Sequence, residues 1–446
     1  MMDLLLIIVF SVLGVLVGVV SGLLPGLHVN NIALILLSVS GSIVALCTPL
    51  SSFGISEQFI VVLICVFITS VSISHSFHDA IPTTFLGAPE EDTALSVLPA
   101  HRLLLQGRGY EAVVFSAIGS LGAIVVCFLL LYPLRFLVGE PLNIYAQLQE
   151  IMFWVLIAIS ILMLATEKGK ITDFGGTKKT QHLIGIGFAT FVFFLSGIFG
   201  LVILNFPLSS PIGLPATVLF PSLAGLFGMP TLVTSLFTKP IIPQQTLDTP
   251  MIKGKIQRAS LISIISGSLS GMFVSLIPGI SSSTGTVIAM NTRKETDNEQ
   301  TIVTLSAVNA SSAFAVIILL YIILKTRSGV TVAINELIPA EEWTSLLIPT
   351  NLIYLLIAVL FSAVISFFLC LRIAKIAAQH FTAIPYGALV MFTIGLISTL
   401  VILFTGILGI VILLIATCIG LLPVLWGVRR SHCMGVLLIP VILYFL

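Results

Sequence analysis

The chain consists of long apolar runs joined by short polar connections. A membrane-spanning helix needs about 20 predominantly apolar residues, and most of the runs reach or approach that length. They occupy residues 4–24, 32–50, 58–74, 112–138, 151–166, 182–206, 212–237, 259–277, 300–324, 346–371, 384–404, 406–427 and 433–446. Strands of a membrane barrel would instead alternate apolar and polar residues over about ten positions. The pattern predicts an all-α polytopic membrane protein with about 10 to 13 membrane-embedded segments, some of them re-entrant.

Composition agrees with a membrane protein and argues against other classes. Hydrophobic residues make up 58% and charged residues 8% of the 446 positions, and the mean hydropathy is +1.20. Soluble domains carry about 25% charged residues, so the bilayer must act as the solvent for this chain. A net charge of +1 argues against nucleic acid as a partner, which requires a basic face. The six cysteines stand singly without CxxC spacing, as is typical of buried apolar positions.

A short motif occurs once in each half of the chain. The first copy comprises Gly14, Gly18, Pro25 and Gly26, and the second comprises Gly267, Gly271, Pro278 and Gly279. Each pair is separated by 253 residues (267 − 14), and the chain has no other Pro-Gly dipeptide. Basic residues precede the second copy but not the first, which indicates opposite orientations in the membrane. We therefore predict two inverted repeats, at residues 1–237 and 238–446.

Each Pro-Gly pair is expected to end a helix inside the membrane. Proline lacks a backbone donor, and glycine adopts conformations that other residues avoid. Freed backbone groups are tolerated in a membrane only where they are buried in protein or line a wet cavity. Secondary transporters place their substrates and ions at such breaks. Polar residues follow both breaks, His28, Asn30 and Asn31 in one copy and Ser281, Ser282, Ser283 and Thr284 in the other. A kink that merely improves packing is the alternative.

A second polar stretch lies at residues 72–112, and its proline and glycine positions predict a re-entrant hairpin near residues 75–99. Three interpretations of His75, His78 and Asp79 remain open: a metal site, a proton relay or coupling-ion site, and a hydrogen-bonded structural corner. No HExxH pattern supports the metal. Glu90 begins an acidic cluster that is either part of the coupling site or a charge cluster at a helix N-terminus. In the second half, Asn309 takes roughly the place of residues 78–84.

The succession of these motifs resembles the large membrane subunit of the tripartite tricarboxylate transporters, the TctA family, and especially its archaeal-type members. The resemblance runs from about residue 10 to residue 320. It rests on "GLLPGL" and "SLIPGI" at the two breaks, on "LLQGRGYEA" after the first polar stretch, and on "LFPSLAGLFGMP" at residues 219–230.

The resemblance implies a subunit that translocates a carboxylate by means of an ion gradient. It also implies two partners, a small membrane subunit and an extracytoplasmic binding protein. By resemblance, the site is framed by Pro25, Gly26, Asn30, Asn31, Pro278, Gly279, Ser281 and Ser282, and lined by Thr83, Thr84, Gly87 and Asn309. Acidic residues near the first hairpin would repel an anion. Either the substrate is another anion, or these residues belong to the ion-coupling apparatus.

Together these observations predict a secondary active transporter in the cell membrane of a prokaryote. It would move an organic anion, most simply a carboxylate, with Na⁺ or H⁺ by alternating access. The ion-coupling candidates are His28, His75, His78, Asp79 and Glu90. No cofactor or metal beyond the coupling ion is predicted, and membrane lipid is the expected surrounding. The alternative is a translocase for a lipid-linked phosphate such as a polyprenyl phosphate, since broken helices suit phosphate equally well. An enzyme is not predicted.

Overall fold

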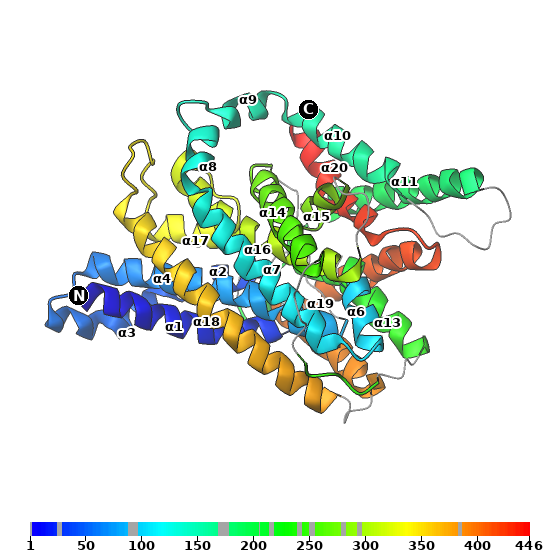
Figure 1. Cartoon of the computed structure of the whole chain (residues 1–446), viewed down its shortest axis with the longest axis horizontal. Coiled ribbons are helices and arrows are strands. Elements are labelled where there is room, and N and C mark those ends of the chain that lie inside the picture. Colours follow the sequence, from blue (N-terminus) through cyan, green and yellow to red (C-terminus); the bar gives the residue numbers. More distant parts are fainter. Residues whose placement is uncertain are drawn as a thin grey trace.

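The computed structural model of the chain describes residues 2–24, 29–87, 97–167, 178–204, 206–213, 218–238, 243–248, 255–277, 282–291, 297–381 and 386–446. Within these ranges the secondary structure is helical and no strand occurs. The predicted all-α fold is therefore confirmed. Figure 1 shows the helices as several groups rather than one parallel bundle, with the N-terminal helices at one end of the long axis.

The helices of the first half are α1 (Met2–Leu23), α2 (Val29–Ser38), α3 (Ser40–Cys47), η1 (Thr48–Phe53), α4 (Glu57–His78), α5 (Ala80–Phe85), α6 (Val97–Leu105), α7 (Gly109–Leu129), α8 (Leu131–Val138), α9 (Ile144–Glu150), α10 (Met152–Ala165), α11 (Lys178–Ile203), α12 (Leu219–Leu223), the π-helical turn η3 (Ala224–Gly228) and α13 (Met229–Thr238). Those of the second half are α14 (Lys255–Ser275), α15 (Ser282–Asn291), α16 (Asn298–Ile323), α17 (Gly329–Leu337), α18 (Thr350–Phe381), α19 (Tyr386–Leu425), η4 (Arg430–Met434) and α20 (Gly435–Tyr444).

Nine described helices are long and apolar enough to cross a membrane. The number rises to ten if α9 and α10, which meet at an angle of 76°, form one bent span. The shorter apolar helix Arg430–Tyr444 comes in addition. The protein is therefore a multi-pass membrane protein, as the apolar runs predict.

One apolar run differs from the expected span. Residues 32–50 do not form one long helix, because the chain is divided among α2, α3 and η1. The runs expected at 384–404 and 406–427 meet in α19, where Gly406, with φ 70° and ψ −166°, separates two helical parts. Only glycine adopts such a conformation readily, and it stands at the boundary between the two expected runs.

Helices α1 and α4 pack more closely than ordinary side chains allow. A Cβ atom added at Gly14 would lie 2.6 Å from the Phe67 carbonyl oxygen, and one at Gly18 would lie 2.6 Å from the Val71 carbonyl oxygen. One turn further on, a Cβ atom at Gly22 would lie 2.7 Å from the carbonyl oxygen of His75. Small residues that let helix backbones approach are the usual basis of tight packing in membranes. These glycines therefore fix the register of α1 on α4.

Helices α14 and α16 repeat this contact. A Cβ atom at Gly267 would lie 2.7 Å from the Thr304 carbonyl oxygen, and Gly271 approaches the Val308 carbonyl oxygen in the same way. The residue numbers of α14 equal those of the corresponding positions in α1 plus 253 (267 − 14). Those of α16 equal the corresponding positions in α4 plus 237 (304 − 67). The correspondence agrees with the predicted repeat. Its inverted sense and the boundary at residue 238 stay predictions.

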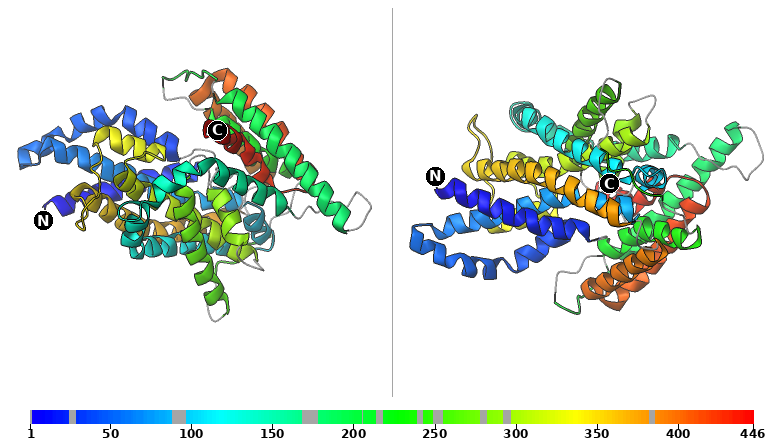
Figure 2. Two further views of the ribbon diagram at one scale, coloured as in Figure 1. Left: turned by 90° about the horizontal axis from the view of Figure 1, so that it is seen from above. Right: turned by 60° about the horizontal axis from the view of Figure 1, so that its bottom comes forward.

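Each helix pair packs against the long helix that follows the other pair in the sequence. Helix α7 follows the first pair along the chain but packs on α14 and α16, whereas α18 follows the second pair and packs on α1 and α4. Helices α7 and α18 also touch each other. The right view of Figure 2 shows α18, in gold, lying between dark-blue α1 and cyan α7. The two halves are interleaved, so neither pair is packed only by its own half of the chain.

Candidate functional site

The second part of α4 is polar although it is buried. The helix begins at a Ser56 cap whose side chain accepts a hydrogen bond from the Phe59 amide. Its buried polar residues are Thr69, Ser70, Ser72, Ser74, His75, Ser76 and His78, with Asp79 directly after them. Polar groups are expensive in a membrane interior unless they are hydrogen-bonded or functional. This concentration of polar groups identifies the α4–α5 region as the candidate site.

The helical backbone is interrupted between α4 and α5. Pro82 has no N–H group, so it cannot donate to the carbonyl group of His78 four residues earlier. The Thr83 hydroxyl donates to the Asp79 carbonyl oxygen at 2.7 Å, and the Thr83 amide does so at 3.2 Å. From α18, the Cys370 thiol donates to the Phe77 carbonyl oxygen at 3.2 Å. The chain therefore continues as a helix to Phe85, but side chains bond to the backbone carbonyl groups around the break.

The two histidines face α1, where the glycines leave room for them. The His75 Nδ1 atom lies 3.0 Å from the Ser21 hydroxyl of α1. The His78 Nδ1 atom lies 2.7 Å from the Ser74 carbonyl oxygen, so this nitrogen carries the proton and donates it. The His78 Nε2 atom is buried and has no hydrogen-bond partner among the described residues. An accepting nitrogen is thus available inside the protein, next to a carboxylate in the sequence.

The Asp79 carboxylate joins the two halves of the protein. The Asn309 side-chain amide of α16 donates to the Asp79 Oδ2 atom at 3.4 Å, a long hydrogen bond. Asp79 is 3% exposed and Asn309 is 6% exposed. The predicted coupling residue and the predicted substrate residue are therefore neighbours, although 230 positions separate them.

The second helix pair provides an internal comparison for these residues. When 237 is added to the positions of His75, His78 and Asp79, the counterparts are a serine, an alanine and a valine at 312, 315 and 316. Two close-packed helix pairs of the same kind therefore form with and without ionisable side chains. The packing of α1 on α4 does not require histidine or aspartate, and the ion-coupling site and the structural corner both stay predictions.

This register corrects one sequence-based assignment. Asn309 was expected to correspond roughly to residues 78–84, but the glycine contacts make it the counterpart of Ser72 (72 + 237). The intervals differ because the chain between the two paired helices is longer in the first half, where α3 and η1 lie. Asn309 meets Asp79 across the interface and not as its symmetry counterpart.

Several predicted site residues lie outside the described residues, namely Pro25, Gly26, His28, Glu90, Pro278, Gly279 and Ser281. Asn31 lies in α2, but its side chain is not described. Asn30 is placed, and its Oδ1 atom accepts a hydrogen bond from the Gly329 amide of α17 at 2.9 Å. Thr84 and Ser282 are each 3% exposed, and Gly87 has φ 64°. The predicted hairpin near residues 75–99 is only partly described and stays a prediction.

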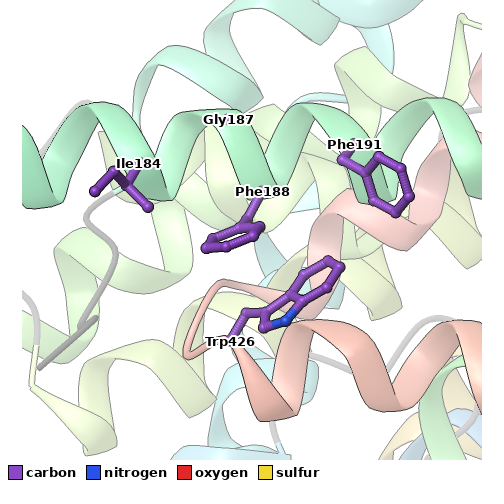
Figure 3. Close-up of a pocket in the computed structure, with 5 residues that line it drawn as sticks. All are labelled: Ile184, Gly187, Phe188, Phe191 and Trp426. Carbon is purple, nitrogen blue, oxygen red and sulfur yellow. The ribbon is translucent and has the colours of Figure 1, made fainter. Parts of the chain in front are cut away.

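Neither of two other features has the chemistry of a metal or anion site. The described residues contain no group of three or more His, Cys, Asp and Glu side chains arranged to hold a metal ion. A surface groove lies between α11 and the end of α19, lined by Ile184, Gly187, Phe188, Phe191 and Trp426 (Figure 3). The Phe188 ring stacks on the Trp426 indole with centroids 4.5 Å apart. Because these walls are apolar and aromatic, the groove suits a lipid chain and not a carboxylate.

A charged cluster outside the polar α4–α5 region was not predicted from the sequence. The Glu167 Oε2 atom lies 2.6 Å from the His432 Nε2 atom and 3.2 Å from the Arg429 Nε atom. Burial raises the pKa of Glu167, but hydrogen bonds from His432 and Arg429 and their charges outweigh it and lower the pKa to about 2. The cluster ties the end of α10 to the segment after α19. We assign it a structural role, because the Glu167 carboxylate is paired with Arg429 and His432 of the same chain.

Comparisons with known proteins extend over nearly the whole chain. Residues 8–435 match the family described as the tripartite tricarboxylate transporter TctA family. The chain is also similar to an uncharacterized protein of Methanocaldococcus jannaschii, with 29% identity over 444 residues, which cover 98% of this chain and 99% of that protein. No solved structure matches.

Proposed function

Since the chain belongs to the tripartite tricarboxylate transporter TctA family, and is therefore a membrane permease of that type, we propose that it moves an organic carboxylate coupled to Na⁺ or H⁺ by alternating access. The resemblance seen in the sequence is thus confirmed at the level of the family. The substrate, the coupling ion and the transport cycle are the content of the proposal.

The hydrogen bond between Asp79 and Asn309 carries the proposal. It places a carboxylate and an amide in contact inside the membrane, where each half of the protein contributes one partner. A site between two related halves can be opened to either side when the halves move against each other. A change in the charge of Asp79 would alter its interaction with Asn309, and this links ion binding to the contact between the halves.

The roles of the residues follow from their chemistry. Asp79, His75 and His78 can bind or release a cation or proton. Thr83, Thr84, Gly87 and Asn309 offer neutral polar groups, as do Asn30, Asn31, Ser281 and Ser282 beside the two Pro-Gly breaks. Pro25-Gly26 and Pro278-Gly279 lie outside the described residues, and the sequence-based prediction that backbone amides there bind an anion is kept as part of the proposal. The coupling ion and the substrate are proposed to bind in this polar region.

The remaining assignments rest on the family. The tripartite family implies a small membrane subunit and an extracytoplasmic binding protein as partners, and we propose that this chain works with both. The cell membrane of a prokaryote is the proposed location. A lipid-linked phosphate is not proposed, because the family description names tricarboxylates.

A thermal-shift screen of the purified protein tests the proposal. Citrate, succinate and phosphate would each be added with sodium or choline chloride, at an acidic and an alkaline pH. A ligand that binds the native state stabilises it by about 2.7 kcal/mol at 100 times its Kd. We expect one carboxylate to raise the melting temperature in a way that depends on Na⁺ or on pH.

Two variants complete the screen. Asp79→Asn should abolish the dependence on Na⁺ or pH, because the ionisable group is lost. Asp248→Asn serves as the matched control, because Asp248 is exposed. Stabilisation by phosphate alone would exclude a carboxylate carrier. A dependence on Na⁺ or pH that survives in Asp79→Asn would remove Asp79 from the coupling site.

A further inference from the structure

Arg430 is held against the π-helical turn η3. It is the first residue of η4, and its Nη1 atom donates to the Phe227 carbonyl oxygen at 3.1 Å and to the Thr231 hydroxyl. Single π-helical turns within helices often occur at functional sites. Here the turn presents a carbonyl group and, four residues later, a hydroxyl to the same guanidinium nitrogen. One edge of the Arg430 side chain is therefore fixed in place.

These contacts place the guanidinium of Arg430 at the level of the middle of a candidate membrane span. Phe227 and Thr231 lie beside the middle of the candidate span Leu219–Phe237. A side chain bonded to both residues lies at a similar level along that helix. Ionisable groups at such a depth are rare, costly and generally functional.

The charge of Arg430 is not neutralised in the same way as that of its neighbour. Arg429 forms an ion pair with the buried Glu167 carboxylate, 3.2 Å away. Arg430 forms no ion pair with a carboxylate in the part of the chain that the structure describes. A half-buried charge at the level of the middle of a membrane span is unfavourable when it has no counter-charge. The position of Arg430 is therefore explained best by an anion that comes from outside the chain.

The remaining edge of the guanidinium suits a carboxylate. The Nε and Nη2 atoms make no hydrogen bond to the described residues, and the side chain is only half-buried. Two neighbouring N–H groups of arginine match the two oxygen atoms of a carboxylate in geometry and charge. An incoming carboxylate can therefore bind without displacing the contacts to Phe227 and Thr231.

Elements from both halves surround this position. Burial, and then the positive charge of Arg430, lowers the pKa of the His101 imidazole in α6. Helix α15, which follows the second Pro-Gly break, packs on η4. The Thr284 hydroxyl of α15 is fully buried and has no partner within the described ranges.

We propose that Arg430 binds a carboxylate group of the transported anion, with Phe227 and Thr231 as the residues that orient its guanidinium. The proposal rests on the proposed function, because it assumes that the substrate is an organic anion. It adds a substrate-binding cation that is distinct from the polar α4–α5 region. Arg430 attracts the anion, and the Asp79 region is left for the coupling ion.

The first experiment is a thermal-shift titration with citrate and, separately, with succinate. It compares the wild-type protein with Arg430→Gln and Arg430→Lys, and with Arg372→Gln as the matched control, because Arg372 is exposed. Loss of a charged hydrogen bond should weaken apparent binding about 10- to 100-fold in Arg430→Gln. Arg430→Lys keeps the charge without the paired N–H groups and should give an intermediate value. Arg372→Gln should bind as the wild type does.

The outcomes separate this inference from the proposed function. If citrate or succinate stabilises the wild type and Arg430→Gln equally, the inference fails and the carboxylate carrier stands. If neither carboxylate stabilises the wild type, both fail.

A second measurement needs no variant and remains informative if Arg430→Gln does not fold. The native protein is treated with phenylglyoxal, which modifies guanidinium groups, with and without citrate or succinate. Mass spectrometry then gives the rate of modification at Arg430 and Arg372. We expect one of the carboxylates to slow the reaction at Arg430 only. Equal rates at Arg430 with and without a carboxylate that stabilises the protein would overturn the inference.

Discussion

Glu167 gives the most quantitative prediction about this protein. Its side chain is 3% exposed and accepts hydrogen bonds from His432 and Arg429. The variant Glu167→Gln keeps the size of the side chain and removes its charge. Arg429, whose side chain is 34% exposed, then loses its counter-charge, and the fully buried His432 ring loses a charged hydrogen-bond partner, both of which are destabilising.

The magnitude follows from the pKa of the carboxylate. The contacts of the folded state lower the pKa of Glu167 from an ordinary value of 4.5 to about 2. Each tenfold change in the acid constant is worth about 1.4 kcal/mol, so the folded state gains about 3 kcal/mol from the ionised group. Because the folded pKa is the lower one, this stabilisation is present above pH 4.5 and is lost as the pH falls towards 2.

The assay is thermal unfolding followed by tryptophan fluorescence, which can be recorded at neutral and at acidic pH. Trp343 is 2% exposed, so its emission should shift when the protein unfolds. Unfolding entropies of about 2.1 cal/mol/K per residue convert about 3 kcal/mol into a shift of about 3 °C for a chain of this size. At neutral pH we expect Glu167→Gln to melt lower by about that amount.

Two results would contradict the reasoning. Equal melting temperatures of Glu167→Gln and wild type at neutral pH would show that the ion pair contributes no net stability. A difference that persists unchanged at a pH near 2 would show that the loss comes from packing and not from charge. Glu150→Gln is the control, since Glu150 is exposed, and it should melt as the wild type does at every pH.

Three further predictions concern the packing of the helices. Gly18→Leu should lower the melting temperature by an amount equivalent to about 1–3 kcal/mol or more, because its Cβ would lie 2.6 Å from a carbonyl oxygen of α4; Gly395→Leu should not, since no atom lies within 4 Å there. Arg108→Gln should cost only about 1 kcal/mol, a loss that high salt should reduce, because the paired guanidinium is 34% exposed. A disulfide between Ser116→Cys and Ser306→Cys should form under mild oxidation, because the two hydroxyl oxygens are 2.8 Å apart; its absence in the folded protein would contradict the packing of α7 on α16.

The sequence predicted the helical membrane fold because long apolar runs have few alternatives in a bilayer. It was less successful where a run contains its own interruption. Residues 32–50 are predominantly apolar, yet the chain is divided among α2, α3 and η1 there. Hydropathy reports the environment of a segment and says little about its direction, so short packed helices and a single span look alike.

The repeated glycines were recognised in the sequence, but their role required the structure. Gly14 and Gly18 mark where α1 touches α4, and the partner positions on α4 are carbonyl groups, which leave no pattern in the sequence. The second half keeps the interval of 253 residues in one helix and 237 in the other. A search for a repeat with one fixed interval therefore matches α1 with α14 but does not match α4 with α16. The candidate residue Asp79, directly after α4, is missed with it.

Arg430 was overlooked for a related reason. It stands beside Arg429 between two apolar runs, and such a pair normally marks the end of a span at the membrane surface. The structure distinguishes the two arginines, because Arg429 has the Glu167 carboxylate and Arg430 has a carbonyl group and a hydroxyl near the middle of another span. The two adjacent arginines are visible in the sequence, but the depth of each side chain cannot be read from it.

The buried Asp79 and the half-buried Arg430 have opposite charges and belong to different parts of the fold. Asp79 contacts α16 through Asn309, and Arg430 contacts the turn η3 and lies on η4 beside α15. If both sites bind their ions, each brings its own counter-charge, so the loaded protein carries less uncompensated charge inside the membrane than the empty one. If the sites changed sides with only one of the two ions bound, one charge would be left unpaired inside the membrane, which is costly. Coupling between anion and cation then follows from the electrostatic cost of binding only one of them.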